Sequence, residues 1–169
     1  MKNHIRLTRA FRSTPESILS RKEHEIQDKI SRRAHELFAS SGLTHGHDLQ
    51  DWLSAESELY QAIPLTFSQT EKSVTVKAEL PGFTEHDIEV TIEPCRLAIS
   101  GQRDQKSEEE RKGSVVSSER RSLHAFRILD LPAEVDPDKV RATFSNGELE
   151  VTLIKKHIGH IHIIQEMVA

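Results

Sequence analysis

Histidines are the side chains of this sequence whose type and spacing come closest to a reactive or metal-binding site. His157, His160 and His162 cluster near the C-terminus, and the last two share one face of an extended segment. Such a cluster could bind a transition metal, although it more often forms an exposed, pH-sensitive surface. His45 and His47 lie in a connection between two predicted helices, where capping or packing competes with metal binding.

Motifs for phosphate binding and for catalysis are missing from the sequence. It contains neither G-x-x-x-x-G-K nor G-x-G-x-x-G, and neither G-x-S-x-G nor H-E-x-x-H. We therefore expect no use of ATP, no cofactor and no enzymatic activity, while a scattered Ser-His-Asp triad stays open. Cys95 is the single cysteine, which excludes an internal disulfide framework and a cysteine-based zinc site and fits a reducing, cytoplasmic compartment.

Composition and charge limit the class of protein further. The chain has 169 residues, of which 36% are hydrophobic and 30% charged, so we expect one ordered core with polar segments around it. The net charge of −4 argues against nucleic acid as a partner. No apolar run approaches the roughly 18 residues of a membrane-spanning helix. Residues 1–23 are predicted to form a flexible basic arm, with a transit peptide as the alternative.

Residues 24–60 have the period of two short helices. Apolar residues recur at steps of three and four from about His24, Gly42 is placed to end the first helix, and Asp48 is placed to cap the second. The pattern predicts a helical hairpin. A helix-turn-helix that binds DNA is the alternative, but the second helix carries four acidic residues and no basic one, so phosphates would repel it.

From residue 64 to residue 156 the period changes to two. Val74, Val76 and Ala78 alternate with polar residues, and several similar runs follow, separated by Pro, Gly and Asn-Gly turns. Residues 102–117 are almost wholly polar and are predicted to be a solvated loop, with Val115-Val116 as a very short strand within it. Seven or so short strands predict an immunoglobulin-like antiparallel β-sandwich, so the fold class is mainly β with a small α-helical hairpin in front.

The tail, residues 157–169, contains one further apolar segment. Ile161 and Ile163 project from the same side if the segment is extended. A short apolar strand without a core of its own can add to an exposed sheet edge, where its two isoleucines would fill pockets. The alternative is a last strand of the same sandwich.

Five sequence motifs in order resemble the α-crystallin domain of small heat-shock proteins over residues 64–164. They are the segments 76–82 (VKAELPG), 97–101 (LAISG), 118–132 around Phe126-Arg127, 142–149 (ATFSNGEL) and 161–163 (IHI). The fourth fits the family's A-x-x-x-N-G-x-L signature, with its turn at Asn146-Gly147 and its last position at Leu149. Residues 26–60 resemble instead a short bacterial domain of unknown function.

The resemblance implies an ATP-independent chaperone of the stress response, a holdase that binds unfolded or partly unfolded client proteins. It implies a homo-oligomer built from dimers, in which Ile161 and Ile163 anchor in a groove of a neighbouring subunit. By the same resemblance, that groove would lie between the strand with Val90 and Ile92 and the strand with Ala142 and Phe144. Arg127 matches an arginine near the family's dimer interface.

Two departures and two alternatives accompany the resemblance. The last core strand ends Leu153-Ile-Lys155, without the family's usual proline, and the loop 102–117, which swaps between subunits in some members, has no aromatic residue here. A co-chaperone-like adaptor that binds one defined partner through the same sandwich is the main alternative function. A metal-handling protein acting through the histidines is a remote one.

Overall fold

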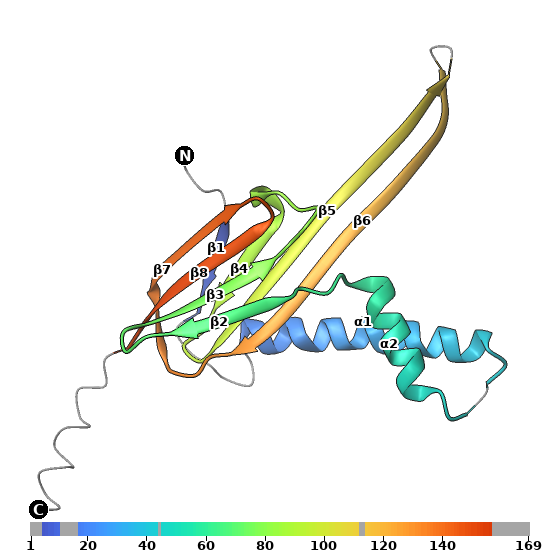
Figure 1. Cartoon of the computed structure of the whole chain (residues 1–169). Helices are drawn as coiled ribbons and strands as arrows, with labels where there is room; N and C mark the ends of the chain where they lie inside the picture. The colour runs from blue at the N-terminus through green and yellow to red at the C-terminus, as the bar shows by residue number, and fades with distance from the viewer. Residues whose placement is uncertain (1–4, 11–16, 44, 112–113, 157–169) are drawn as a thin grey trace, which may run out of the picture.

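Two four-stranded sheets pack face to face in the computed structural model, which describes residues 5–10, 17–43, 45–111 and 114–156 (Figure 1). The first sheet has the order β1 (Arg6–Arg9), β4 (Ile88–Ile92), β5 (Arg96–Arg111) and β6 (Ser114–Asp130). The second has the order β2 (Leu65–Gln69), β3 (Ser73–Glu79), β8 (Glu148–Lys155) and β7 (Val135–Ser145). A short 3-10 helix, Glu85–Asp87, precedes β4. The predicted antiparallel β-sandwich is confirmed.

The core lies between the sheets because the apolar side chains alternate along each strand. In β8, Leu149, Val151 and Leu153 are fully buried, and they pair in register with Ala78, Val76 and Val74 of β3. The facing sheet supplies Val90 and Ile92 from β4 and Leu97 and Ile99 from β5, also buried. Each fully buried aliphatic side chain stabilises the fold by roughly 1.5–3 kcal/mol relative to exposure, so this core dominates the stability of the sandwich.

The turn between β7 and β8 consists of Asn146 and Gly147. Both have positive φ, 52° and 78°, and the flanking Ser145 and Glu148 are paired. This conformation is the tight hairpin turn that asparagine followed by glycine favours, because asparagine tolerates the left-handed region and glycine enters it without steric cost. The turn sets the register that brings Leu149 into the core.

The prediction of a loop over residues 102–117 is wrong: residues 102–111 and 114–117 belong to the long paired strands β5 and β6. Pairing of β5 with β4 ends at Gly101, but β5 and β6 continue to pair with each other as far as Arg111 and Ser114. The hairpin projects well beyond the sandwich (Figure 1). Among the described residues no third strand pairs with this extension, and its sequence lacks the alternation that identifies a strand.

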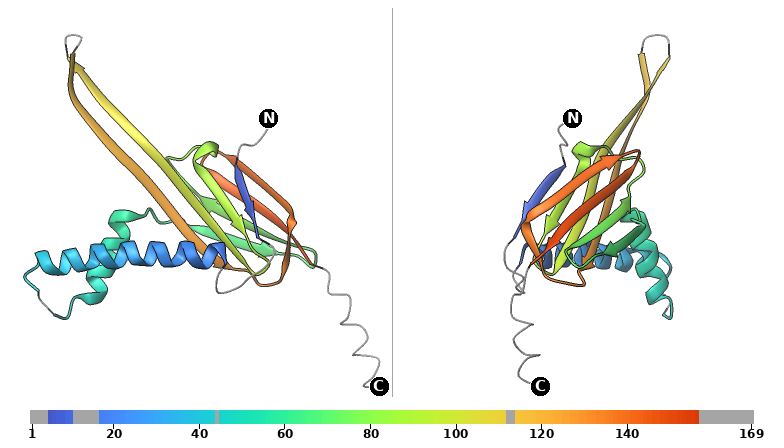
Figure 2. Two further views of the ribbon diagram at one scale, coloured as in Figure 1. Left: turned by 180° about the vertical axis from the view of Figure 1, so that it is seen from behind. Right: turned by 60° about the vertical axis from the view of Figure 1, so that its left-hand side comes forward.

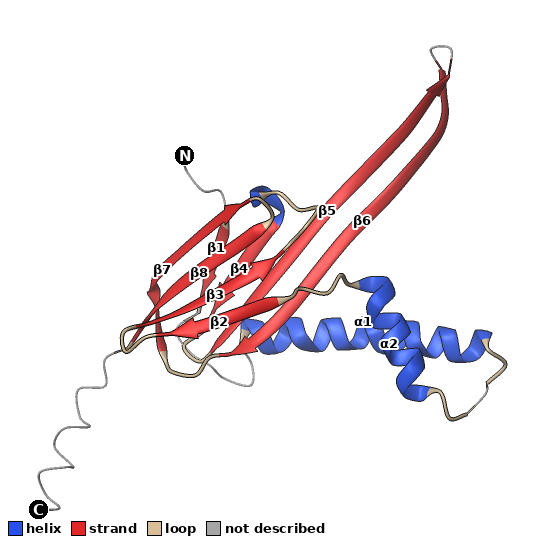
Figure 3. Ribbon diagram, viewed as in Figure 1, coloured by secondary structure: helices blue, strands red, loops and turns tan. Residues whose placement is uncertain are grey.

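Two helices, α1 (Ile18–Ser40) and α2 (Asp48–Leu59), pack against each other beside the sandwich (Figure 3). Arg33 of α1 donates a 2.6 Å hydrogen bond from Nε to Glu58 of α2, and this contact raises the pKa of the arginine. Gly42, predicted to end the first helix, follows its C-cap with a φ of +82°. Asp48 was predicted as the cap of α2, but it is the first helical residue, and His47 occupies the cap position.

The first helix begins six residues before the predicted His24, inside the segment predicted as a flexible arm. Ser17 is its N-cap, and the Ser17 hydroxyl accepts a hydrogen bond from the backbone N–H of Ser20. Leu19 is fully buried in this first turn, and its N–H donates to the carboxylate of Glu93, also fully buried, which follows β4. The early start depends on a residue about 70 positions away, so local periodicity did not reveal it.

Candidate functional site

The edge of β4 is the position in the sandwich where an extended segment from elsewhere in the chain is bound. Strand β1 pairs with β4 in parallel, with Leu7 opposite Val90 and Arg9 opposite Ile92. The N–H of Ala10 closes the pairing with a 2.8 Å bond to the carbonyl of Ile92. The side chains of Ile5 and Leu7 pack against the sandwich core. This arrangement is β-augmentation: backbone bonds provide the pairing, and alternate apolar side chains fill the space beside it.

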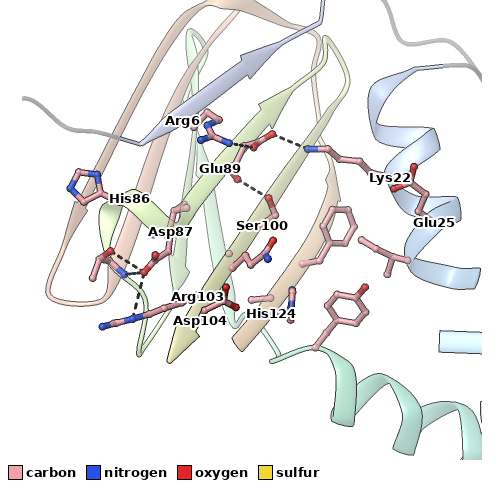
Figure 4. A pocket seen from close by; sticks show the side chains of 18 of the residues that line it. Arg6, Lys22, Glu25, His86, Asp87, Glu89, Ser100, Arg103, Asp104 and His124 are labelled. Atoms are coloured by element: carbon pink, nitrogen blue, oxygen red, sulfur yellow. Dashed lines mark hydrogen bonds and ion pairs between the residues drawn. The ribbon is translucent and has the colours of Figure 1, made fainter. Parts of the chain in front are cut away.

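Glu89, the second residue of β4, contacts polar side chains of β1 and also contacts α1 (Figure 4). Its carboxylate lies 2.9 Å from Nζ of Lys22 and 3.5 Å from a guanidinium nitrogen of Arg6, and it accepts a 3.3 Å hydrogen bond from the hydroxyl of Thr8. Partial burial raises the pKa of Glu89, but the contacts with Lys22, Thr8 and Arg6 outweigh burial and hold that pKa below its ordinary value. Glu89 is therefore ionised at neutral pH.

The four residues predicted to line the anchor-accepting groove lie on strands of two different sheets, β4 beside the edge strand β1 and β7 at the edge of the second sheet. Val90 and Ile92 are buried in β4, whereas Ala142 and Phe144 lie in β7, the edge of the second sheet. All four belong to the core or pack against it, together with β1, and β1 runs beside the β7 edge (Figure 2). The anchor residues Ile161 and Ile163 lie outside the described residues, so their docking stays a prediction.

Strand β1 was not predicted from the sequence, although its apolar-polar-apolar spacing was visible there. Ile5-Arg-Leu7 has the same apolar-polar-apolar spacing as Ile161-His-Ile163. Four residues are too few for periodicity to identify a strand, and only pairing with β4, about 80 positions away, makes the segment extended. The likeness of Ile5-Arg-Leu7 to Ile161-His-Ile163 was the one sequence feature that could have indicated a short strand here.

A second sheet edge belongs to β2, at the opposite end of the second sheet from β7. Within the described residues β2 pairs only with β3, and Phe67 at its centre is 49% exposed. Arg127, predicted at the dimer interface, is exposed on β6 and donates a 2.7 Å hydrogen bond to the carbonyl of Ile63, just before β2. The arginine therefore ties β6 to the β2 edge within one chain, and its role between chains stays a prediction.

A cavity of about 730 Å³ lies between α1 and the first sheet (Figure 4). Its lining is polar and carries both charge signs, but Arg103 already donates to the carbonyl of Gly82 at 2.8 Å and lies 3.9 Å from Asp87. In the described part of the chain no group of three His, Cys, Asp or Glu side chains could hold a metal ion. The cavity offers polar surface rather than an assembled reactive group.

The helical hairpin presents apolar side chains to solvent. Leu49 and Leu53 of α2 are 72% and 47% exposed, while Ala55 is fully buried. The His45 ring lies near the Phe38 ring, with centroids 5.5 Å apart and the planes tilted by 50°, which agrees with packing as the alternative to metal binding. His157, His160 and His162 lie outside the described residues. Across the described ranges no helix is long and apolar enough to cross a membrane.

Comparison with known proteins assigns most of the chain to one family. Residues 66–165, more than half of the chain, match the Hsp20/alpha crystallin family. Residues 25–61 match a family described as a protein of unknown function (DUF2934), as the resemblance of the helical segment predicted.

Individual relatives agree with this assignment. Heat shock protein HSP.16.4 of Streptococcus thermophilus is 33% identical over 129 residues, which cover 76% of this chain and 89% of the relative. Small heat shock protein C2 of Rickettsia felis is 36% identical over 105 residues, covering 61% and 67%. Among solved structures, heat shock protein 16.0 from Schizosaccharomyces pombe is 34% identical, with a TM-score of 0.46, and covers 56% of this chain and 87% of that chain.

Proposed function

Because this chain belongs to the Hsp20/alpha crystallin family, we propose that it is an ATP-independent holdase that binds partly unfolded proteins and limits their aggregation. The family supports a chaperone role, and binding alone performs it: apolar surface on the chaperone covers apolar surface on the client, so that clients no longer associate with one another. The working form is an oligomer built from dimers, in the cytoplasm, without a nucleic-acid partner.

The pairing of β1 with β4 is the observation that carries this proposal. A segment of five residues, Ile5–Arg9, remote in sequence, is held at the side of β4 by backbone bonds and by two apolar side chains. A partly unfolded client exposes segments of the same kind, namely extended backbone with apolar residues two apart. The sandwich therefore has a surface suited to such segments, and no covalent chemistry is required.

Two features support assembly into dimers. The β5–β6 hairpin extends from Gly101 with only its own two strands paired, and the β2 edge on the second sheet has free backbone groups along one side in the described structure. An unpaired edge is a template for a strand from another chain. We propose that the hairpin of one subunit pairs with the β2 edge of the other, beside Phe67 and Arg127, and that Ile161 and Ile163 then join dimers.

Client capture is proposed to use exposed apolar side chains, of which Leu49 and Leu53 on α2 are examples. They lie one helical turn apart and so form one patch. Substituting both by serine is expected to weaken protection of a client without unfolding the sandwich. Gln50→Ser is the matched control, since Gln50 is an exposed polar residue of the same helix.

The test is suppression of aggregation. A heat-labile enzyme is heated with and without this protein, in the absence of ATP, and light scattering is followed. Holdase activity predicts a large reduction at an equimolar chain ratio, and unchanged scattering would contradict the proposal. Oligomer size distinguishes the holdase from the alternative, an adaptor that binds one defined partner. A plain dimer whose size does not change in the double variant Ile161→Ala with Ile163→Ala favours the adaptor. A large assembly that dissociates to dimers in that variant favours the holdase.

A further inference from the structure

A groove lined by apolar side chains lies where the helical hairpin meets the first sheet. Its volume is about 340 Å³, within the range of roughly 300–1,000 Å³ that binding clefts occupy. The apolar lining comes from three elements: Ile26 and Ile30 of α1, Trp52 of α2, and Phe126 and Ile128 of β6. Ile30 is buried and the other four are half-buried. The groove therefore needs both the helices and the sandwich, and neither part forms it alone.

The side of α2 that borders this groove carries further apolar residues into solvent. Leu49, Trp52, Leu53 and Glu56 follow one another at helical spacing, so they share one side of the helix. The opposite side packs on α1, and Ala55 there is fully buried. Exposed leucines that continue an apolar groove form the kind of surface that an amphipathic segment of another protein covers.

The acidic charge of α2 is largely unpaired. The helix carries Asp48, Asp51, Glu56 and Glu58 and no basic residue. Within the described residues only Glu58 has an ion-pair partner, Arg33 of α1, at 2.6 Å. Three carboxylates on a helix of 12 residues are thus left without a neighbouring cation. Their charge attracts a basic partner and repels an acidic one.

The charged residues that line the groove itself leave one carboxylate for a ligand. Arg127, the basic residue of the described lining, donates a 2.7 Å hydrogen bond to the carbonyl of Ile63. Glu23, on the α1 side, is paired with Arg96 at 3.4 Å. Glu56 is exposed and has no ion pair in the described structure. It is therefore the group that a cation of a bound segment would contact.

We propose that this groove and the adjoining leucines of α2 bind client segments that are both apolar and cationic. The apolar residues of the segment enter the groove beside Trp52, and a lysine or arginine one helical turn away pairs with Glu56. Such segments are selected over acidic segments of equal apolar content. The inference rests on the proposed holdase function and adds the class of client segment that the helical hairpin selects.

Two helix-forming peptides test this selection. Each has about 14 residues, because shorter helices are marginal in water. Both carry leucines spaced three and four apart and no tryptophan, and their polar positions are all lysine in one and all glutamate in the other. Each is titrated into the full chain at low salt. Trp52 is the single tryptophan of the chain, so its emission reports on the groove. The lysine peptide is expected to bind about tenfold more tightly and to shift that emission to shorter wavelengths.

Charge reversal in the groove separates local recognition from the effect of net charge. Glu56→Lys is expected to lower the affinity for the lysine peptide about fivefold or more. Glu71→Lys is the matched control: it alters the net charge equally, but Glu71 is exposed in the connection between β2 and β3, so the affinity stays unchanged. Leu49→Ser with Leu53→Ser is expected to weaken binding of the same peptide about tenfold, since two apolar contacts are lost.

The peptide titrations have three outcomes that overturn the inference. Equal affinity for the two peptides, within about twofold, removes the charge selection. Equal effects of Glu56→Lys and Glu71→Lys, or binding without a shift of the Trp52 emission, place the site outside the groove. An emission that shifts on dilution of the chain alone, and that does not respond to peptide, assigns the groove to a second copy of the chain.

Light scattering keeps this inference distinct from the holdase proposal. A chain that suppresses aggregation but binds neither peptide leaves the holdase function in place and refutes the selection. A chain that does neither refutes both. Where both activities are present, Glu56→Lys is expected to protect a basic client less well than the natural chain does, and an acidic client no less well. An equal loss of protection for both clients would also refute the selection.

Discussion

The buried carboxylate of Glu93 is expected to control whether α1 stays attached to the sandwich. Its side chain is fully buried, one oxygen accepts the N–H of Leu19, and the other lies 3.6 Å from Nε of Arg96. Glu93→Gln keeps the volume but removes the charge. A hydrogen bond to a charged acceptor contributes about 1.5–3 kcal/mol, and loss of a whole buried ion pair costs about 3–5 kcal/mol. In Glu93→Gln, Arg96 keeps its hydrogen bonds to Ser17 and Ser20, so we expect the smaller cost of about 1.5–3 kcal/mol.

Hydrogen exchange of α1 measures this cost locally. A loss of about 1.5–3 kcal/mol corresponds to amide exchange roughly ten- to a hundredfold faster in the first turns of the helix, with the β3–β8 core unchanged. Glu23→Gln is the matched control: Glu23 pairs with the same Arg96 at 3.4 Å, but its side chain is 41% exposed, so loss of the pair costs under about 1 kcal/mol. Exchange in α1 that changes less than threefold in Glu93→Gln, or that rises equally in the core strands, would refute the anchoring role.

Three further outcomes follow from the structure. Gly101→Ala is expected to destabilise the fold by about 1–3 kcal/mol in thermal unfolding, because a Cβ there would lie 2.9 Å from the Phe83 ring, and Phe83→Leu should recover part of the loss. Since the folded-state pKa of Glu89 lies below its ordinary 4.5, its stabilisation is complete above about pH 4.5 and is lost as the pH falls through the folded-state value; Glu89→Gln should flatten that part of the stability–pH curve. Arg127→Gln should weaken self-association measured by sedimentation, whereas an unchanged dimer would remove Arg127 from the interface.

The sandwich was predictable from the sequence because its strands carry their own evidence. Each run such as Val74-Val76-Ala78 alternates, since one face is buried and the other is solvated. The Asn146-Gly147 turn has a local chemical cause and needs no distant partner. These elements are therefore set by neighbouring residues, and period and turn chemistry were sufficient to locate them.

The start of α1, strand β1 and the outer β5–β6 hairpin were not predictable in the same way. The first turn of α1 depends on Glu93, and β1 depends on β4; both partners are 70 or more positions away. Beyond Gly101, β5 and β6 pair only with each other in the described part of the chain, so no further strand imposes alternation on their residues. In each case the conformation is decided by a contact that a local window does not contain.

Two of the three elements that were not predicted, β1 and the outer hairpin, are also those for which a function is proposed. A strand with its own buried face cannot leave without exposing the core, so it suits a scaffold. By contrast, β1 pairs only with the β4 edge, the surface proposed to hold client segments of the same apolar spacing. The outer hairpin likewise has free backbone groups that a β2 edge of another chain would satisfy. Both segments are hard to predict locally for the same reason that they can be exchanged. Each is ordered by pairing with the edge of another strand, and such an edge can also pair with a strand of another chain.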